Sequence, residues 1–66
     1  MVIILNGEPF TLDGPGTIAT LLRHLDIDAR RVAVERNLQI VRRAAYDTTD
    51  LADGDRIEIV NFVGGG

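Results

Sequence analysis

The sequence predicts one α+β domain in which a single short helix packs against a mixed sheet of four to five strands. Two segments near the ends of the chain, 2–5 and 56–62, are rich in β-forming aliphatic residues. Between them lies one clear amphipathic helical stripe, at 18–25. With 66 residues, of which 45% are hydrophobic, the chain can build one small core.

A hairpin opens the predicted fold. The apolar segment 2–5 is followed by Asn6-Gly7, a pair that suits a type I′ turn because both central positions need a positive φ. The return strand, 8–12, carries Pro9. Because proline has no N–H, it belongs at the start of this strand or on its solvent-facing side.

The helix follows a segment of turn-forming residues, 13–16, that ends the hairpin. Thr17 stands at the N-cap position. The helix spans about two turns and is too short to be stable alone, so it must form by laying its apolar stripe on the sheet. That stripe consists of Ile18, Leu21, Leu22 and Leu25.

Three further strands are predicted in the second half of the chain, at 32–35, 38–41 and 56–62. Asn37 suits a left-handed turn between the first two, whereas 44–51 has no clean period and indicates a loop or a short helical turn. The last strand is as apolar as the first, so we expect the two to pair in parallel at the centre of the sheet. One helix on such a sheet is the β-grasp, the simplest arrangement that buries every apolar stripe.

Side-chain alternation in the last strand predicts an exposed apolar patch. Ile57 and Ile59 share one face and are expected to meet the helix. Val60 and Phe62 then lie on the open face of the sheet, beside Ile4 of the first strand, and lead to the end of the chain. Such a patch is typical of a partner surface. The alternative is that Phe62 covers the edge of the sheet within the same molecule.

The charge distribution argues against nucleic acid as a partner. The net charge is -3, and the seven Lys and Arg residues are all arginines. Two adjacent pairs do not make the basic stripe that phosphate binding requires. One of these pairs, Arg42 and Arg43, is either a solvated edge or a contact for an acidic patch on a partner protein.

Composition also narrows the chemistry. The chain has no cysteine, which excludes disulfides, thiolate metal sites and a thiol nucleophile. His24 is expected to be solvated, and the aspartates between 47 and 55 lack the spacing of a calcium loop, so no metal site is predicted. The longest apolar run, 1–5, is too short to cross a bilayer, which favours a cytoplasmic protein without a membrane partner.

Short motifs in a fixed order run through the whole chain. They are Val-Ile-Ile-Leu-Asn-Gly at 2–7, the Thr17 helix with Leu21-Leu22, Val-Ala-Val-Glu-Arg-Asn at 32–37, Ile40-Val41 with a following arginine, Asp-Gly-Asp-Arg-Ile-Glu-Ile-Val at 53–60, and Val-Gly-Gly-Gly at 63–66. Together they resemble the ThiS family, the ubiquitin-like sulfur carrier proteins of thiamine biosynthesis. The segment 42–46, Arg-Arg-Ala-Ala-Tyr, departs from the Pro-Arg and Trp that are frequent in the family, and leaves open whether Arg42 or Arg43 matches the family's arginine.

The resemblance implies a carrier rather than an enzyme. A ThiF-like adenylating enzyme, akin to those that activate ubiquitin, would use ATP to convert the Gly66 carboxylate into an acyl adenylate. A persulfide donor would then give a C-terminal thiocarboxylate. A ThiG-like thiazole synthase would take up its sulfur to build the thiazole ring, and no cofactor would stay bound to the carrier.

The terminal glycines suit this chemistry. An α-carboxylate, with a pKa of about 3.3 to 3.7, is ionised at neutral pH and is a poor electrophile, so it must be activated inside a partner's site. Gly64 and Gly65 have no side chain to obstruct a narrow channel and can follow it with φ of either sign. The sequence thus predicts a domain at 1–63 and a flexible tail at 64–66.

Four alternatives stay open at this point. The closest is the small subunit of molybdopterin synthase, which also ends in Gly-Gly on a β-grasp, although those chains are usually longer. Others are a β-grasp interaction module without tail chemistry, and a modifier conjugated to proteins through the same activated tail. Terminal glycines can also be a frayed chain end.

Overall fold

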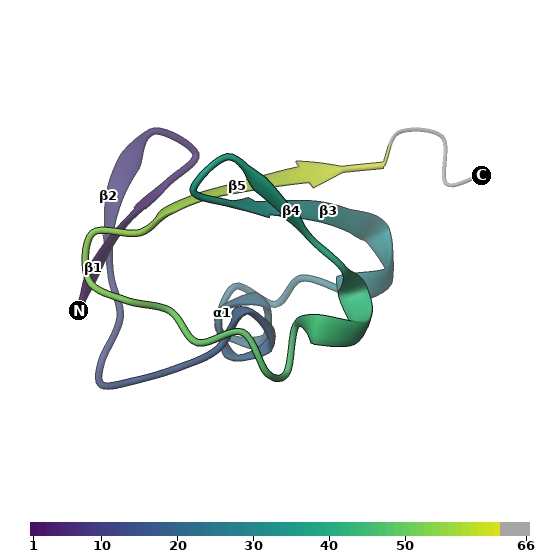
Figure 1. The fold of residues 1–66 in the computed structure, drawn as a ribbon. Coiled ribbons are helices and arrows are strands. Elements are labelled where there is room, and N and C mark those ends of the chain that lie inside the picture. The colour runs from purple at the N-terminus through teal and green to yellow at the C-terminus, as the bar shows by residue number, and fades with distance from the viewer. Residues whose placement is uncertain (63–66) are drawn as a thin grey trace.

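A five-stranded mixed sheet with one helix on a single face forms the fold in the computed structural model, which describes residues 1–62 (Figure 1). The spatial order of the strands is β2-β1-β5-β3-β4. In chain order the elements are β1 (Val2–Leu5), β2 (Glu8–Thr11), α1 (Ile18–His24), a 3₁₀ turn (Ala29–Arg31), β3 (Val32–Arg36), β4 (Gln39–Val41), a second 3₁₀ turn (Arg43–Ala45) and β5 (Arg56–Asn61). The predicted β-grasp is therefore confirmed.

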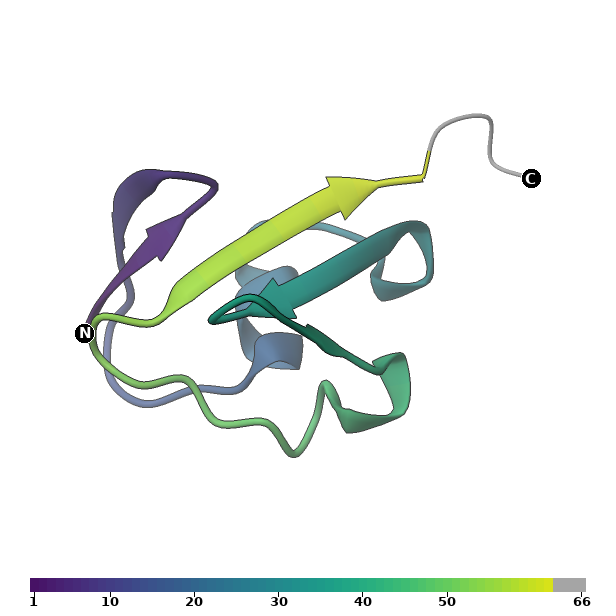
Figure 2. The same ribbon diagram turned by 45° about the horizontal axis from the view of Figure 1, so that its top comes forward.

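The last strand, β5, occupies the centre of the sheet, as predicted (Figure 2). It pairs in parallel with β1, with Ile4 opposite Arg56 and Leu5 opposite Ile57. On its other side it pairs with β3 in antiparallel register from Val32–Asn61 to Arg36–Ile57. β1 therefore accompanies only the beginning of β5, whereas β3 accompanies it to its end.

The core lies between α1 and the sheet. Thr17 caps the helix as predicted, because its side chain accepts a hydrogen bond from Thr20 N at 3.2 Å. The helical stripe is buried at Ile18, Leu21 and Leu22. The sheet, the hairpin exit and the segment before β5 supply the other buried hydrophobic residues, which are Ile3, Leu12, Val32, Val34, Tyr46, Leu51 and Ile57. No helix among residues 1–62 is long and apolar enough to span a membrane.

Two tight turns with left-handed residues join the strands. The predicted Asn6-Gly7 turn has φ values of 49° and 85°. The second turn contains Asn37 at 52° and Leu38 at 71°. The prediction that a strand begins at residue 38 was wrong, because both positions of this turn need a positive φ and β4 begins one residue later.

A buried carboxylate ties the second turn to the beginning of β5. Asp55 accepts hydrogen bonds from Arg36 Nε at 2.8 Å, Asn37 Nδ2 at 3.1 Å and Ala52 N at 2.8 Å. Burial by itself would raise the pKa of Asp55, but these three donors outweigh it and hold the pKa below its usual value. The carboxylate is therefore a structural element of the fold.

Candidate functional site

The face of the sheet opposite α1 exposes apolar side chains near the end of β5. Val60 is 60% exposed and Phe62 is 59% exposed, so the predicted orientation of both side chains is confirmed. Val60 lies opposite Ala33 of β3. The main-chain N–H of Phe62 donates to Arg31 O at 2.8 Å. The backbone at the end of β5 is therefore held by the sheet while the side chains face solvent.

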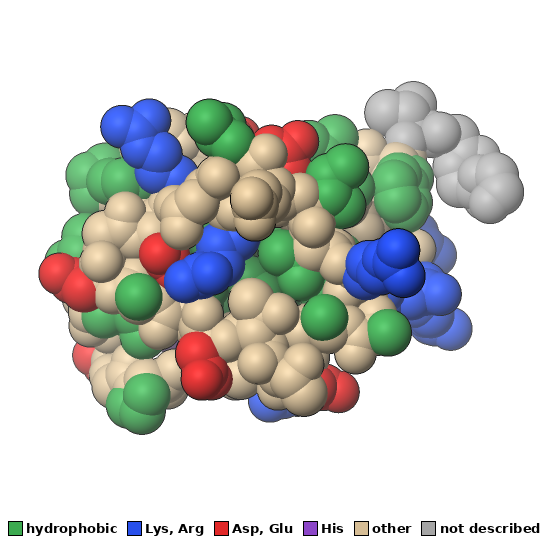
Figure 3. All heavy atoms as spheres, in the orientation of Figure 1, with side chains coloured by type: hydrophobic (Ala, Val, Ile, Leu, Met, Phe, Trp, Pro, Cys, Tyr) green, Lys and Arg blue, Asp and Glu red, His purple; other side chains and the backbone are tan. Residues whose placement is uncertain are grey.

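A shallow groove of about 300 Å³ brings Phe62 together with the arginine pair. Its polar wall is formed by Arg42 and Arg43, and its apolar wall includes Ala33, Ile40 and Phe62. Figure 3 shows hydrophobic and arginine side chains on the surface at this end of the molecule. We call the surface formed by Ala33, Ile40, Arg42, Arg43, Val60 and Phe62 the docking face.

Ile40 belongs to the docking face although the sequence did not assign it there. Its side chain is 77% exposed, whereas the next residue, Val41, packs against the core. The signal was alternation within β4, which places neighbouring side chains on opposite faces. The sequence alone could not show which of the two adjacent aliphatic residues, Ile40 or Val41, is the buried one.

The predicted position of Ile4 beside Val60 was wrong. Ile4 does lie on the open face, since its neighbour Ile3 is fully buried in the core. The register, however, places Ile4 opposite Arg56, four residues before Val60 and roughly 13 Å away along the strand. The parallel pairing ends early, so β3 rather than β1 provides the neighbour of Val60.

Three arginines gather around the end of β5 in a chain whose net charge is -3, and two acidic residues, Glu35 and Glu58, lie opposite each other on the same open face, beside Ile40. Arg31, Arg42 and Arg43 are exposed, and none of them forms a salt bridge within residues 1–62. The adjacent Arg30 is paired with Asp28, at 3.0 Å between Nη2 and Oδ2. The hydrogen bond from Arg30 lowers the pKa of Asp28 to about 2, so this pair remains ionised over the physiological range. Three arginines are left to meet an acidic partner surface.

The predicted tail residues lie outside the described part of the chain. They are Gly64, Gly65 and Gly66, of which Gly66 carries the carboxylate expected to be activated. The predicted boundary at residue 63 lies outside it as well. What residues 1–62 contribute is the position of Phe62, from which the chain continues into Val63 and the glycines.

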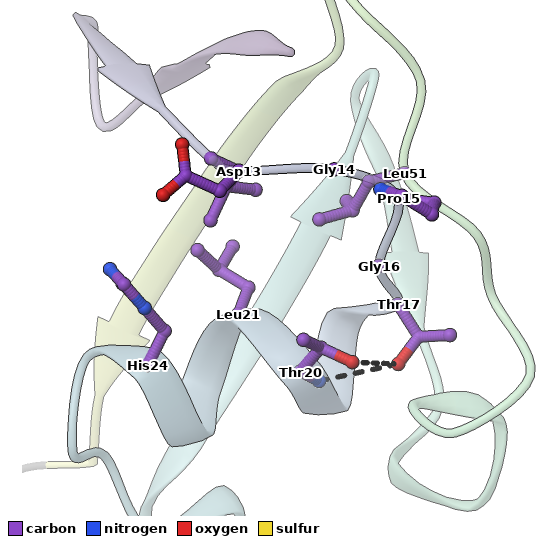
Figure 4. Close-up of a pocket in the computed structure, with 10 residues that line it drawn as sticks. Asp13, Gly14, Pro15, Gly16, Thr17, Thr20, Leu21, His24 and Leu51 are labelled. Atoms are coloured by element: carbon purple, nitrogen blue, oxygen red, sulfur yellow. Dashed lines mark hydrogen bonds between the residues drawn. The ribbon is translucent and has the colours of Figure 1, made fainter.

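A second cavity, of about 170 Å³, lies on the other side of the molecule from the sheet's open face, between the 13–16 loop and α1 (Figure 4). Leu12, Leu21 and Leu51 form its apolar wall, and Asp13 and His24 stand at its rim. The hydroxyls of Thr17 and Thr20 are 3.1 Å apart and pair with each other. These two hydroxyl groups therefore have partners within the chain.

His24 is exposed, as predicted, but it is not without a neighbour. Its ring meets Phe10 of β2 edge-to-face, with 5.9 Å between the ring centroids. No group of three or more His, Cys, Asp or Glu side chains within residues 1–62 is arranged to hold a metal ion.

A central last strand, a single helix on one face and a solvent-exposed face at the end of that strand define a ubiquitin-like β-grasp protein. The chain belongs to the ThiS family, whose model matches residues 3–66.

Relatives and solved structures agree with this membership. The sulfur carrier protein ThiS of Bacillus subtilis is 47% identical over 51 residues, which are 77% of each chain. The crystal structure of a thiamine biosynthesis protein (ThiS) from Geobacter metallireducens is 39% identical, covers all of both chains and superposes with a TM-score of 0.86. The thiazole synthase of Paramagnetospirillum magneticum is 46% identical over all 66 residues. The chain spans 20% of the length of that thiazole synthase.

Proposed function

We propose that this chain is a sulfur carrier of thiamine biosynthesis whose working group is the carboxylate of Gly66. The observation that carries the proposal is the docking face, which combines exposed Val60 and Phe62 with free arginines and stands next to the point where the glycine segment begins. A protein that presents its own chain end to an enzyme needs such a surface beside that end. Family membership supports the same role.

In the proposed reaction sequence, partner enzymes perform every covalent step. The Gly66 carboxylate attacks the α-phosphorus of ATP, and pyrophosphate leaves, which gives an acyl adenylate. The terminal sulfur of a donor persulfide displaces AMP, and a thiol then cleaves the S–S bond to leave a thiocarboxylate. The chain supplies only the carbonyl carbon and the surface that delivers it, so no side chain of residues 1–62 acts as acid or base.

A thiazole synthase is the acceptor that the comparisons favour. Two relatives of that name, from Paramagnetospirillum magneticum and Magnetococcus marinus, each match this chain over all 66 residues at 46% and 44% identity. In both, the matching region makes up 20% of the protein. The occurrence of a region like this chain within proteins named thiazole synthase supports a thiazole synthase as the acceptor.

The docking face has a defined role in this proposal. The adenylating enzyme buries the exposed apolar side chains of Val60, Phe62 and Ile40. Arg42 and Arg43 pair with acidic residues of that enzyme and raise the rate of encounter. The contacts hold the domain in place while the glycines lead the carboxylate into a site that also holds ATP. The arginines should therefore act mainly on the association rate and the apolar residues on complex lifetime.

The test is reconstitution of thiazole formation with a ThiF-like adenylating enzyme, ATP, a persulfide donor and a ThiG-like thiazole synthase. The full chain should support turnover, whereas deletion of Gly66 or addition of one residue after it should abolish turnover. Both changes should leave the melting temperature nearly unchanged, because the buried core is formed by residues between Ile3 and Ile57. If the chain with an added residue is as active as the original, no free Gly66 carboxylate is involved, and an interaction module without tail chemistry becomes the better description.

A further inference from the structure

β5 loses its neighbour on one side before the strand ends. Alternate residues of β5 direct their main-chain N–H and C=O groups toward β3, as Phe62 does toward Arg31 O. Ile57 and Ile59, which alternate with those residues, direct these groups toward the β1 side of the strand. By the same alternation Asn61 faces that side as well. The pairing with β1 stops at Leu5–Ile57, because the chain turns away at Asn6.

The side chain of Asn6 takes the place of the missing strand. Its Oδ1 accepts a hydrogen bond from Ile59 N at 2.8 Å, and its Nδ2 donates to Ile59 O at 3.3 Å. The main-chain N–H of Asn6 also donates to Ile57 O at 2.8 Å. A carboxamide has the same donor and acceptor as a peptide group, so Asn6 extends the β1 side of the ladder by one further residue.

This clamp acts on the part of β5 that carries the docking face. Ile59 lies opposite Val34 in the sheet register, and its main-chain N–H and C=O both form hydrogen bonds with the Asn6 side chain. Val60 and Phe62 follow it directly, and their direction depends on the twist of the strand at Ile59. Without the clamp, only β3 would hold the strand from Glu58 onward.

We propose that Asn6 is a positioning residue for activation of the chain end, because its side chain fixes the direction in which β5 leaves the sheet. This inference rests on the proposed function. An acyl transfer inside a partner's site requires the reacting carboxylate to arrive in a narrow range of positions, and a displacement of about 1 Å can lower the rate by about 100-fold. Asn6 acts on this step through Ile59 and touches neither ATP nor the carboxylate.

The chain contains a matched control in its other turn. Asn37 also has a positive φ, at 52° against 49° for Asn6, and its Oδ1 also accepts from a main-chain N–H of β5. Its partner is Arg56 N, at the beginning of the strand rather than near its end. Substitution of Asn37 therefore removes a similar contact, and with it the donor to Asp55, at the beginning of β5, and does not loosen the end that carries Phe62.

The experiment compares Asn6→Gly with Asn37→Gly. Glycine keeps the positive φ that each turn needs and removes the side chain, and with it the carboxamide. Adenylation by the ThiF-like enzyme is measured at saturating ATP, at a temperature well below both melting transitions. We expect Asn6→Gly to lower kcat by about 10- to 100-fold with a small change in KM for the carrier, and Asn37→Gly to keep kcat near the original value. Equal kcat for the two variants would overturn the proposal.

Amide hydrogen exchange tests the clamp without any partner. In the original chain the Ile59 amide should be protected, whereas the Asn61 amide, which points to the same side and has no acceptor within residues 1–62, should exchange rapidly. Asn6→Gly should speed exchange at Ile59 by about five- to tenfold, and Asn37→Gly should not. If the original chain is adenylated and Asn6→Gly is adenylated with the same kcat, the role of Asn6 is refuted while the proposed function stands. If the original chain is never adenylated, the proposed function fails, and the exchange result still reports on the clamp.

Discussion

Replacing Phe62 by alanine separates partner binding from folding. The ring is 59% exposed in the free domain, so its loss removes little core packing, and the free energy of unfolding should change by no more than about 0.5 kcal/mol. Burying a whole phenylalanine side chain contributes about 1.5–3 kcal/mol. If the partner covers the exposed three fifths of the ring, Phe62→Ala should weaken binding by about 1–2 kcal/mol, which is about a 5- to 30-fold increase in Kd.

The assay is isothermal titration of the chain against the ThiF-like enzyme, with melting curves for each variant. Val2→Ala is the control, because Val2 is 42% exposed and its strand register places it at the far end of the open face, opposite Thr11. It should leave the Kd unchanged. If Phe62→Ala and Val2→Ala bind as tightly as the original chain, the docking face has been assigned to the wrong part of the sheet.

Three further predictions concern stability. Leu22→Ala should lower the free energy of unfolding by about 2–5 kcal/mol in urea titrations, because Leu22 is 2% exposed beneath the sheet. Asp55 has a lowered pKa in the folded state, so its ionised form should stabilise the fold above the ordinary aspartate pKa of about 3.9, and this stabilisation should be lost as pH falls through the lowered pKa. Urea titrations at decreasing pH should therefore show a fall in the free energy of unfolding that the Asp55→Asn variant lacks. Leu38→Gly should raise the free energy of unfolding by about 0.5–1 kcal/mol in thermal melts, because Leu38 is exposed and has a φ of 71°.

Most of the fold follows from signals that act over a few residues. The Asn6-Gly7 pair determines the hairpin, and Thr17 with the apolar stripe determines the helix. The central, parallel position of β5 required one argument at longer range, namely that two equally apolar strands must both be buried. The boundary at Leu38 failed because leucine carries no turn signal, and tertiary contacts of Asn37 impose the left-handed turn on its neighbour.

The site was less predictable, because it depends on register between strands that are distant in sequence. Alternation fixed which way Val60 and Phe62 point, but it could not show how far β1 accompanies β5, so Ile4 was placed beside the wrong residue. The same limit concealed the contact of Asn6 with Ile59, 53 residues away. A carboxamide can mimic a peptide group only where a strand has just ended, and that point is a property of the assembled sheet.

Intact-mass spectrometry of the chain tests the central claim most directly. After incubation with ATP, a ThiF-like adenylating enzyme, a persulfide donor and a thiol, the spectrum should show replacement of one oxygen by sulfur, and fragmentation should place the sulfur on Gly66. The shift should be absent without ATP and in the chain that lacks Gly66. A chain that keeps its original mass with active partner enzymes, or a sulfur that maps to any other residue, would contradict the assignment of this chain as a sulfur carrier.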